Sequence, residues 1–262
     1  MEVAMKIGFI GVGAMAKAMI KGYINSGQVN ASDIYVHAPH KEKYLEFANA
    51  TGINCSNSNQ EVAASSDLVI LATGPKQVVD ALKDVRENLN GKILASIAWQ
   101  ISLERLEELT SYDLPIIRLI PNVNVEVNEG MLIYKANENL VDQRLTDTVK
   151  NLETLGKMIE VDEDKFDVSG SLIGCTPAYA YLFADIFSRS AVNHGLDKQT
   201  ATQLAAQAIL GSMKMIEKSD KSPSDLIDDV CSPAGGTIKG LLALKKSGFE
   251  KAVIDCFDAT QE

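Results

Sequence analysis

The sequence predicts two parts, an α/β domain built around a parallel sheet and a C-terminal domain that is entirely α-helical. Three observations support this prediction. Short apolar runs alternate with helical patterns over the first 161 residues, a glycine turn follows the first run, and the alternation ends after Asp162. The predicted domains of the 262-residue chain are therefore 1–161 and 162–262.

The apolar runs of the first domain are bounded by turn residues and separated by segments with helical spacing. Strands are expected at 5–10, 34–38, 53–56, 68–73, 92–97, 116–120, 130–136 and 158–161. Helices are expected at about 14–26, 41–50, 75–89, 102–110 and 140–155. Because consecutive parallel strands are joined by right-handed crossovers, this order predicts βαβ units, with the last three strands at the edge of the sheet.

The residues after Asp162 show helical spacing only. Helices are expected at 177–193, at 198–218, in a short stretch after Ser222–Pro223, and at 237–247. The first two are apolar around most of their circumference, so they must be buried in the domain or against another subunit. Since a helical domain of about 100 residues buries little surface alone, we expect a homodimer formed by these helices.

Composition excludes several classes of function. A formal net charge of −10 leaves no basic surface for nucleic acid. No apolar run reaches the length of about 18 residues that a membrane span needs. The first residues run directly into a strand without a signal peptide, so we expect a mature chain that starts near residue 1 and stays in the cytoplasm. The four cysteines and three histidines are too scattered for a metal site.

A glycine motif follows the first predicted strand. Gly11, Gly13 and Ala16 fit the pattern G-x-G-x-x-G/A. Gly11 permits the tight turn, Gly13 lets the backbone approach a diphosphate, and Ala16 allows close packing of helix on sheet. The competing interpretation is a tight turn without a ligand. Together with the strand–helix alternation, the motif predicts an α/β Rossmann-type dinucleotide-binding domain followed by an all-α C-terminal dimerisation domain.

The end of the second predicted strand indicates which dinucleotide binds. NAD-binding domains usually carry Asp or Glu there to hold the ribose 2′-hydroxyl. Here the segment contains His37, His40 and Lys41, and its first acidic residue is Glu42. Donors and a positive charge suit a 2′-phosphate, so NADPH is the predicted cofactor and NADH the alternative. The competing interpretation of these side chains is a solvated loop.

A second cluster, residues 232–237, reads SPAGGT and comes directly before a predicted helix. Small residues leave the amides of Gly235, Gly236 and Thr237 uncovered at the helix start, which suits a carboxylate. Thr237 adds a hydroxyl that can donate to, or accept from, a neutral group beside that carboxylate. We interpret these three residues as substrate-binding and Thr237 as the catalytic residue. The alternative is an ordinary helix cap.

Five segments carry a resemblance that covers nearly the whole chain: FIGVGAMA, IIRLIPN, GCTPAYAYLFADIFSRSAVNHGL, LAAQAILGS and VCSPAGGTIKGLLALKKSGF. They resemble the pyrroline-5-carboxylate reductase family, whose signature combines a PAY helix, a VxxGL helix end and an SPGGTT-like loop. The resemblance implies an NADPH-dependent oxidoreductase acting on C=N, which reduces the cyclic imine 1-pyrroline-5-carboxylate to L-proline in the last step of proline biosynthesis. It also implies a homodimer, often within a larger ring, with each active site between one subunit's cofactor and the partner's last helices.

The resemblance assigns roles where this chain matches the family's motifs. The diphosphate is expected on residues of the first turn: Ile10, Gly11, Gly13, Ala14 and Met15. Asn59 is expected on the adenosine side of the cofactor. The nicotinamide half is expected on three residues: Ala72, Pro75 and Ala98. The imino-acid pocket is expected to include Glu163, Gly236 and Thr237.

The chain departs from the family pattern at positions that flank these sites: Gly74, Trp99, Gln100, 120–124, 174–179 and Ala234. We interpret the departures as a lineage-specific version of the same enzyme. One alternative is an altered paralogue that acts on another small cyclic imine. Another is a nucleotide-binding sensor without turnover. A 3-hydroxyacid dehydrogenase is disfavoured, because its catalytic lysine on the central helix has no counterpart between Lys165 and Lys198.

Overall fold

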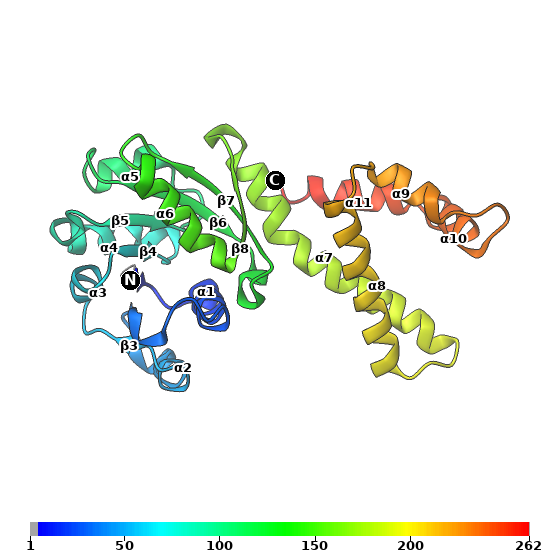
Figure 1. The fold of residues 1–262 in the computed structure, drawn as a ribbon, viewed down its shortest axis with the longest axis horizontal. Helices are drawn as coiled ribbons and strands as arrows, with labels where there is room; N and C mark the ends of the chain where they lie inside the picture. Colours follow the sequence, from blue (N-terminus) through cyan, green and yellow to red (C-terminus); the bar gives the residue numbers. More distant parts are fainter. Residues whose placement is uncertain (1–4, 262) are drawn as a thin grey trace. The chain divides into compact units, whose positions relative to one another are not determined.

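The computed structural model describes residues 5–261, which form two compact units, the first ending at Gly174 and the second beginning at Cys175 (Figure 1). This division falls later than the domain boundary predicted after residue 161. The predicted chain start near residue 1 falls on residues 1–4, outside the described part. Among residues 5–261, no helix is long and apolar enough to cross a membrane.

The first unit contains an eight-stranded sheet in the order β3-β2-β1-β4-β5-β6-β7-β8. Its strands are β1 (Ile7–Ile10), β2 (Ile34–His37), β3 (Asn54–Cys55), β4 (Leu68–Leu71), β5 (Ile93–Ser96), β6 (Ile116–Pro121), β7 (Gly130–Ala136) and β8 (Gly156–Glu160). Neighbouring strands run parallel except β6 and β7, whose connection is too short for a crossover. The predicted parallel sheet with additional strands at one edge is confirmed.

Helices cover both faces of this sheet (Figure 1). They are α1 (Ala14–Asn25), α2 (Leu45–Thr51), α3 (Asn59–Ser65), α4 (Val78–Val85), α5 (Leu103–Leu109) and α6 (Asp142–Leu152). Short 3₁₀ helices link them: η1 (Ala31–Asp33), η2 (Lys41–Lys43), η3 (Pro75–Gln77), η4 (Arg86–Leu89), η5 (Val123–Val127), η6 (Glu153–Leu155) and η7 (Glu163–Lys165). Tyr23 and Leu152 belong to the apolar cluster on one face, and Val62 and Leu82 to the cluster on the other. The first unit is therefore a doubly wound sheet, which is the Rossmann-type architecture predicted for this part of the chain.

The rest of the chain is helical, as predicted, and contains α7 (Phe166–Asn193), α8 (Lys198–Lys218), α9 (Pro223–Val230), α10 (Gly236–Lys246) and α11 (Phe249–Asp258). The predicted start of the first helix at residue 177 is wrong, because α7 begins at Phe166 and contains Pro177. Residues 166–176 include glycines and hydroxyl side chains with weak helix preference. Packing overrides that preference, since Phe166 is fully buried against Ile120 and Ile133.

Helix α11 was not predicted. Gly248 lies between α10 and α11 with a φ of 81°, a left-handed conformation that glycine adopts without steric cost. The prediction of a helix end near this glycine is confirmed. The chain turns there and forms a further amphipathic helix, whose apolar Phe249, Val253 and Ile254 remain exposed in the single chain.

Candidate functional site

The carboxyl ends of β1, β2 and β4 meet at the point where the strand order reverses. Ile10 lies in register with His37 of β2 on one side and with Leu71 of β4 on the other. The Gly11 amide donates to the His37 carbonyl at 2.8 Å, and the Ala72 amide donates to the Ile10 carbonyl at 2.8 Å. In doubly wound sheets this reversal of strand order is where nucleotides bind.

The two glycines of the turn differ in what surrounds them. Gly11 has a φ of 99°, and a Cβ there would lie 2.6 Å from the Ala72 carbonyl oxygen, so only glycine fits. Gly13 has an ordinary φ of −80°, and a Cβ there would meet nothing within 4 Å. Contacts within the protein therefore do not require a glycine at position 13. A backbone open at this point fits the close approach of a diphosphate.

Helix α1 begins directly after this open glycine. No side chain caps its first turn within the described chain, and no acidic residue lies there. Its N-terminal amides, which include those of Ala14 and Met15, lack intrahelical acceptors and carry the positive end of the helix dipole. The predicted diphosphate residues Ile10, Gly11 and Gly13 thus lie together with an uncapped helix start. The arrangement fits the diphosphate of a dinucleotide.

The residues predicted for the adenosine side and the 2′-phosphate lie at the end of β2, on the segment that follows it, and at the start of α3. The His37 Nδ1 lies 2.7 Å from the Asn59 Oδ1, which can accept from it. His40 is exposed and its Nδ1 lies 3.3 Å from Glu42 Oε1, while Lys41 is exposed in η2. The structure thus brings His37 and Asn59 together and leaves His40 and Lys41 on the adjoining surface. Their binding to a 2′-phosphate stays a prediction.

The residues predicted for the nicotinamide half follow β4 and β5. Ala72 and Pro75 lie on the connection after β4, and the buried Ala98 donates its amide to Ser96 Oγ at 3.3 Å. Gln100 has a φ of 59°, which costs a residue other than glycine about 1–2 kcal/mol. Gln100 is one of the departures from the family pattern, and it places backbone strain beside the expected site.

Trp99 also departs from the family pattern, and the structure gives it a packing role. Its indole ring lies so close to Gly170 of α7 that a Cβ there would be 2.8 Å from Trp99 Cζ3. The same Cβ would lie 2.7 Å from Ile120 Cδ1. Trp99 therefore fills space between the end of β5 and the start of α7, while about a third of it stays exposed.

Glu163 begins η7, immediately before α7, and its carboxylate is held by groups of the first unit. Oε1 accepts from the Leu103 amide at 3.1 Å, and Oε2 forms an ion pair with Arg118 Nη1. Arg118 is almost fully buried on β6 and lies over the Phe166 ring, 4.2 Å from its centroid. Sequence analysis missed Arg118, although a charged residue inside the apolar run IIRLI was a visible signal.

The SPAGGT loop forms a β-turn that leads into α10. The Gly235 amide donates to the Ser232 carbonyl at 3.0 Å, with Pro233 and Ala234 as the central residues. The expectation of three uncovered amides is therefore wrong, because the turn uses that of Gly235. Ala234 has a φ of 58° at a position where glycine is usual, so this loop also holds backbone strain.

Thr237 lies in the first turn of α10 and is exposed. No side chain caps this helix start within residues 5–261, and a Cβ on Gly236 would meet nothing within 4 Å. The amides of Gly236 and Thr237 thus lie at an open, uncapped helix N-terminus with a hydroxyl beside them. This arrangement can hold an anion and present one neutral hydrogen-bonding group to it.

Tyr179 of α7 belongs to the PAY segment that carried the resemblance. A hydrogen bond with the Cys256 thiol, followed by burial, raises the pKa of Tyr179 to about 12. This shift keeps the Tyr179 hydroxyl in its neutral form.

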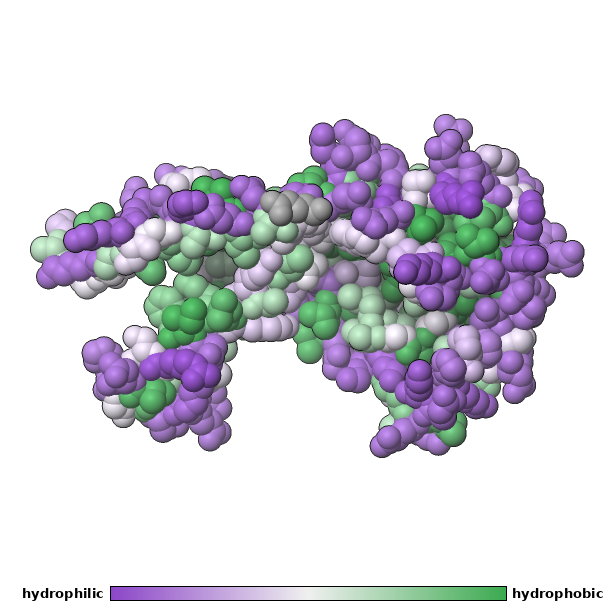
Figure 2. All heavy atoms as spheres, turned by 180° about the vertical axis from the view of Figure 1, so that it is seen from behind, coloured by the Kyte–Doolittle hydropathy of each residue, from purple (hydrophilic) through white to green (hydrophobic). Residues whose placement is uncertain are grey.

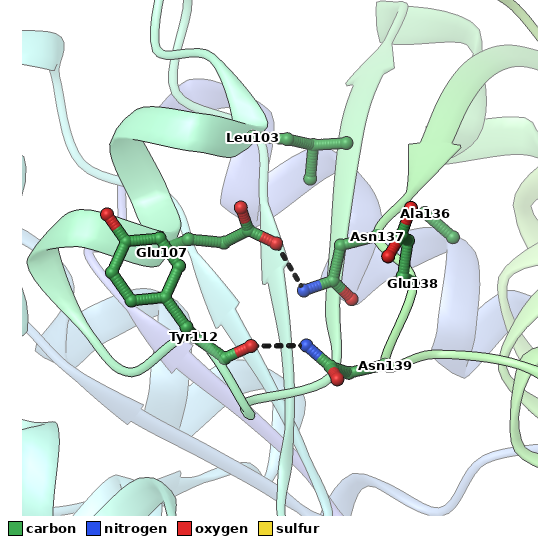
Figure 3. Close-up of a pocket in the computed structure, with 7 residues that line it drawn as sticks. All are labelled: Leu103, Glu107, Tyr112, Ala136, Asn137, Glu138 and Asn139. Carbon is green, nitrogen blue, oxygen red and sulfur yellow. Dashed lines mark hydrogen bonds between the residues drawn. The ribbon is translucent and has the colours of Figure 1, made fainter.

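A polar cavity of about 420 Å³ lies elsewhere in the first unit, between α5 and the end of β7 (Figure 3). Asn137 Nδ2 donates to Glu107 Oε1 at 2.9 Å, and Asn139 Nδ2 donates to the Tyr112 carbonyl at 2.6 Å. Because β7 runs antiparallel to β6, this cavity lies at the amino end of β6, away from the carboxyl ends that meet at Gly11. The Asn137 amide ties the end of β7 to α5, and the Asn139 amide ties two loops together, so we interpret the cavity as structural.

A doubly wound sheet with an open glycine turn at the reversal of strand order defines a dinucleotide-binding protein. Two family models match the chain, namely pyrroline-5-carboxylate reductase dimerisation over residues 163–262 and NADP oxidoreductase coenzyme F420-dependent over residues 6–100. The pyrroline-5-carboxylate reductases of Treponema pallidum and Escherichia coli K12 are each 34% identical to it. These matches cover 95% and 98% of this chain, and 96% of each relative.

A solved structure agrees with the sequence matches. The crystal structure of Plasmodium falciparum pyrroline carboxylate reductase with NADP bound has 30% identity and a TM-score of 0.87. The match covers 98% of this chain and 95% of that one. This chain therefore belongs to the pyrroline-5-carboxylate reductase family.

Proposed function

We propose that this protein is an NADPH-dependent reductase that converts 1-pyrroline-5-carboxylate to L-proline, the last step of proline biosynthesis. The observation that carries the proposal is that a family member retains both the open glycine turn after β1 and the uncapped helix start at Gly236 and Thr237. The names of its relatives and the NADP in the Plasmodium falciparum structure support the activity and the cofactor. The glycine turn and the uncapped helix start together argue against a nucleotide-binding sensor without turnover.

The residues present fit NADPH, as the open Gly13 and the uncapped α1 indicate. In our proposal the diphosphate is held by Ile10, Gly11, Gly13, Ala14 and Met15. His37, His40 and Lys41 hold the 2′-phosphate, Asn59 contacts the adenosine side, and Ala72, Pro75 and Ala98 contact the nicotinamide half. Bound NADPH supplies the hydride that the C=N carbon accepts, and a proton on the ring nitrogen completes the amine.

The protein's part in catalysis is to orient the imine. We assign the substrate carboxylate to the amides of Gly236 and Thr237, and the ring nitrogen to the Thr237 hydroxyl. Neutral amides hold the anion without repelling the cationic iminium, which accepts hydride more readily than the neutral imine. The resemblance also assigns Glu163 to substrate binding, and in the first unit Arg118 pairs with its carboxylate and balances its charge.

We also propose that the second unit forms a homodimer with a second copy of the chain. Figure 2 shows apolar residues gathered on the surface of the helical part. Exposed large side chains of α7 and α8 include Leu182, Ile186, Leu204 and Met213. Burying these side chains against a second copy removes apolar surface from water, so this surface favours association. The larger ring, the cytoplasmic location and the domain boundary after residue 161 stay predictions.

The proposed reaction predicts that the purified protein oxidises NADPH when 1-pyrroline-5-carboxylate is added and forms one proline per NADPH. Absorbance at the nicotinamide band and amino-acid analysis of the product measure the two sides of this balance. A protein that turns over only a different cyclic imine would contradict the substrate assignment. Binding of NADPH without turnover of any imine would favour the sensor instead.

The 2′-phosphate assignment predicts a change in cofactor selectivity. Lys41→Glu should weaken NADPH binding on the order of tenfold and NADH binding little, because only NADPH loses a charge-assisted hydrogen bond. Dissociation constants from titration of the protein's fluorescence measure both. Lys83→Glu, an equal charge change on the exposed surface of α4, is the control. Equal losses for the two cofactors, or a wild type that prefers NADH, would contradict the assignment.

A further inference from the structure

Two of the four cysteines lie on helices of the second unit that contact each other. Cys175 is on α7 at the start of this unit, and Cys256 is near the end of α11. Both cysteines are free and half-buried. Phe183 of α7 and Phe249 of α11 have ring centroids 6.2 Å apart, so the two helices pack on each other there.

The spacing along these helices places the two thiols opposite each other. Because one turn takes about 3.6 residues, Cys175, Tyr179 and Phe183 fall on one face of α7. Phe249 and Cys256 are likewise about two turns apart on one face of α11. Residue numbers fall along α7 from Phe183 to Cys175 while they rise along α11 from Phe249 to Cys256. An antiparallel pair in contact at the phenylalanines therefore brings the cysteines to the same level.

The Tyr179 hydroxyl lies between the two thiols. A helical side chain leans toward the N-terminal end of its helix, so that of Tyr179 reaches back over the turn that carries Cys175. Its hydroxyl forms hydrogen bonds with the thiols of both Cys256 and Cys175. A single hydroxyl thus separates the two sulfur atoms. Cys256 also belongs to the last turn of α11, which ends at Asp258, and the end turns of helices fray.

We propose that Cys175 and Cys256 form a site of reversible oxidation, at which hydrogen peroxide converts the two thiols to a disulfide. One thiolate attacks the peroxide, so an S–O bond forms, the O–O bond breaks and hydroxide leaves. The second thiolate attacks the resulting sulfenic sulfur, so the S–S bond forms, the S–O bond breaks and a second hydroxide leaves. The two thiol protons convert both hydroxides to water. The sulfur atoms lose the two electrons that the peroxide gains.

The disulfide restrains the part of the second unit that carries the proposed substrate site, and this consequence rests on the proposed function. Helix α11 follows α10 after Gly248, and Lys245 Nζ of α10 lies 3.1 Å from Glu250 Oε1 of α11. Helix α10 begins at Gly236, beside Thr237. A covalent bond between α11 and α7 therefore also limits the movement of α10. Oxidation is expected to lower kcat/KM for the imine about tenfold. The dissociation constant for NADPH should be unchanged, because NADPH is assigned to the first unit.

The test treats the full-length protein with hydrogen peroxide, blocks the remaining thiols with N-ethylmaleimide and identifies the peptides by mass spectrometry without reduction. The wild type should yield the Cys175 and Cys256 peptides joined together, lighter by two hydrogen atoms than their sum. Dithiothreitol should separate these peptides and restore the activity. Cys256→Ser should remove both the linked peptides and the reversible loss of activity. Cys55→Ser is the matched control, because it removes a half-buried cysteine of the first unit and should keep both effects.

Three results would overturn the inference. The first is oxidation of Cys175 and Cys256 to separate sulfenic or sulfonic acids without linked peptides. The second is a disulfide between two copies of the chain, which a non-reducing gel reveals as a covalent dimer. The third is unchanged kinetics once the linked peptides have formed, which would remove the effect on the substrate site. A protein without reductase activity before oxidation would instead refute the proposed function, while the linked peptides would still decide whether the thiols form a pair.

Discussion

Thr237→Ala is expected to lower kcat/KM for 1-pyrroline-5-carboxylate about 100-fold, within the range for loss of a positioned polar or proton-transferring group. The hydroxyl lies in the first turn of α10, beside amides that no side chain caps in the described chain. Whatever anchors the substrate carboxylate there also aims the adjacent ring nitrogen, so the loss should appear mainly in the rate of reduction. Steady-state kinetics with NADPH at saturation measure it.

Folding and cofactor binding should be unchanged in Thr237→Ala, because the residue is exposed and belongs to the second unit. Thr237→Ser should keep most of the activity, since the hydroxyl survives. Thr202→Ala is a matched control, because Thr202 is an exposed helical threonine of the same unit whose hydroxyl donates to the Lys198 carbonyl. Wild-type kinetics in Thr237→Ala would show that the SPAGGT loop serves only as a helix start.

Arg118→Met is expected to lower the free energy of unfolding of the first unit by about 3 kcal/mol. The change keeps most of the side-chain volume but removes the charge that pairs with Glu163 and, at 3.7 Å, with Asp167. Glu163 would keep only the Leu103 amide in a half-buried position. Urea unfolding followed by Trp99 fluorescence measures the loss, because Trp99 packs beside Gly170 near the start of α7.

Two comparisons separate this ion pair from a general effect of lost charge. Arg105→Met removes an exposed arginine that pairs with Glu108, and it should cost less than about 1 kcal/mol. In a double-mutant cycle, Arg118→Met with Glu163→Gln should cost less than the sum of the single changes, because each change alone leaves the other group unpaired. Additive losses would show that Arg118 stabilises the unit through packing on Phe166 alone.

Much of the fold could be predicted because its signals are local. Strand lengths, helical spacing and Gly11, Gly13 and Ala16 are properties of neighbouring residues, and the predicted βαβ order followed from them. The start of α7 could not be predicted in this way. Phe166 is held in the helix by contacts with Ile120 and Ile133, which are distant in the sequence.

The candidate site was predictable to the same extent. Gly13 and Thr237 could be recognised because each stands at a helix start within a short motif. Arg118 and Cys175 could not be assigned roles, since their significance depends on burial and on partners, which only the assembled fold specifies. The use of the Gly235 amide inside the turn likewise depends on the left-handed backbone at Ala234, a conformation unusual for alanine.

The amino-acid sequence alone determined the class of fold, the glycine turn and the family resemblance, because these depend on residue type and spacing along the chain. Only the tertiary structure decided which polar groups meet. It paired Glu163 with Arg118 across the sheet and brought the thiols of Cys175 and Cys256 to one tyrosine hydroxyl. The physical reason is that hydrogen bonds and ion pairs require contact in space, and residues far apart in the sequence come into contact only when the strands pair and the helices pack.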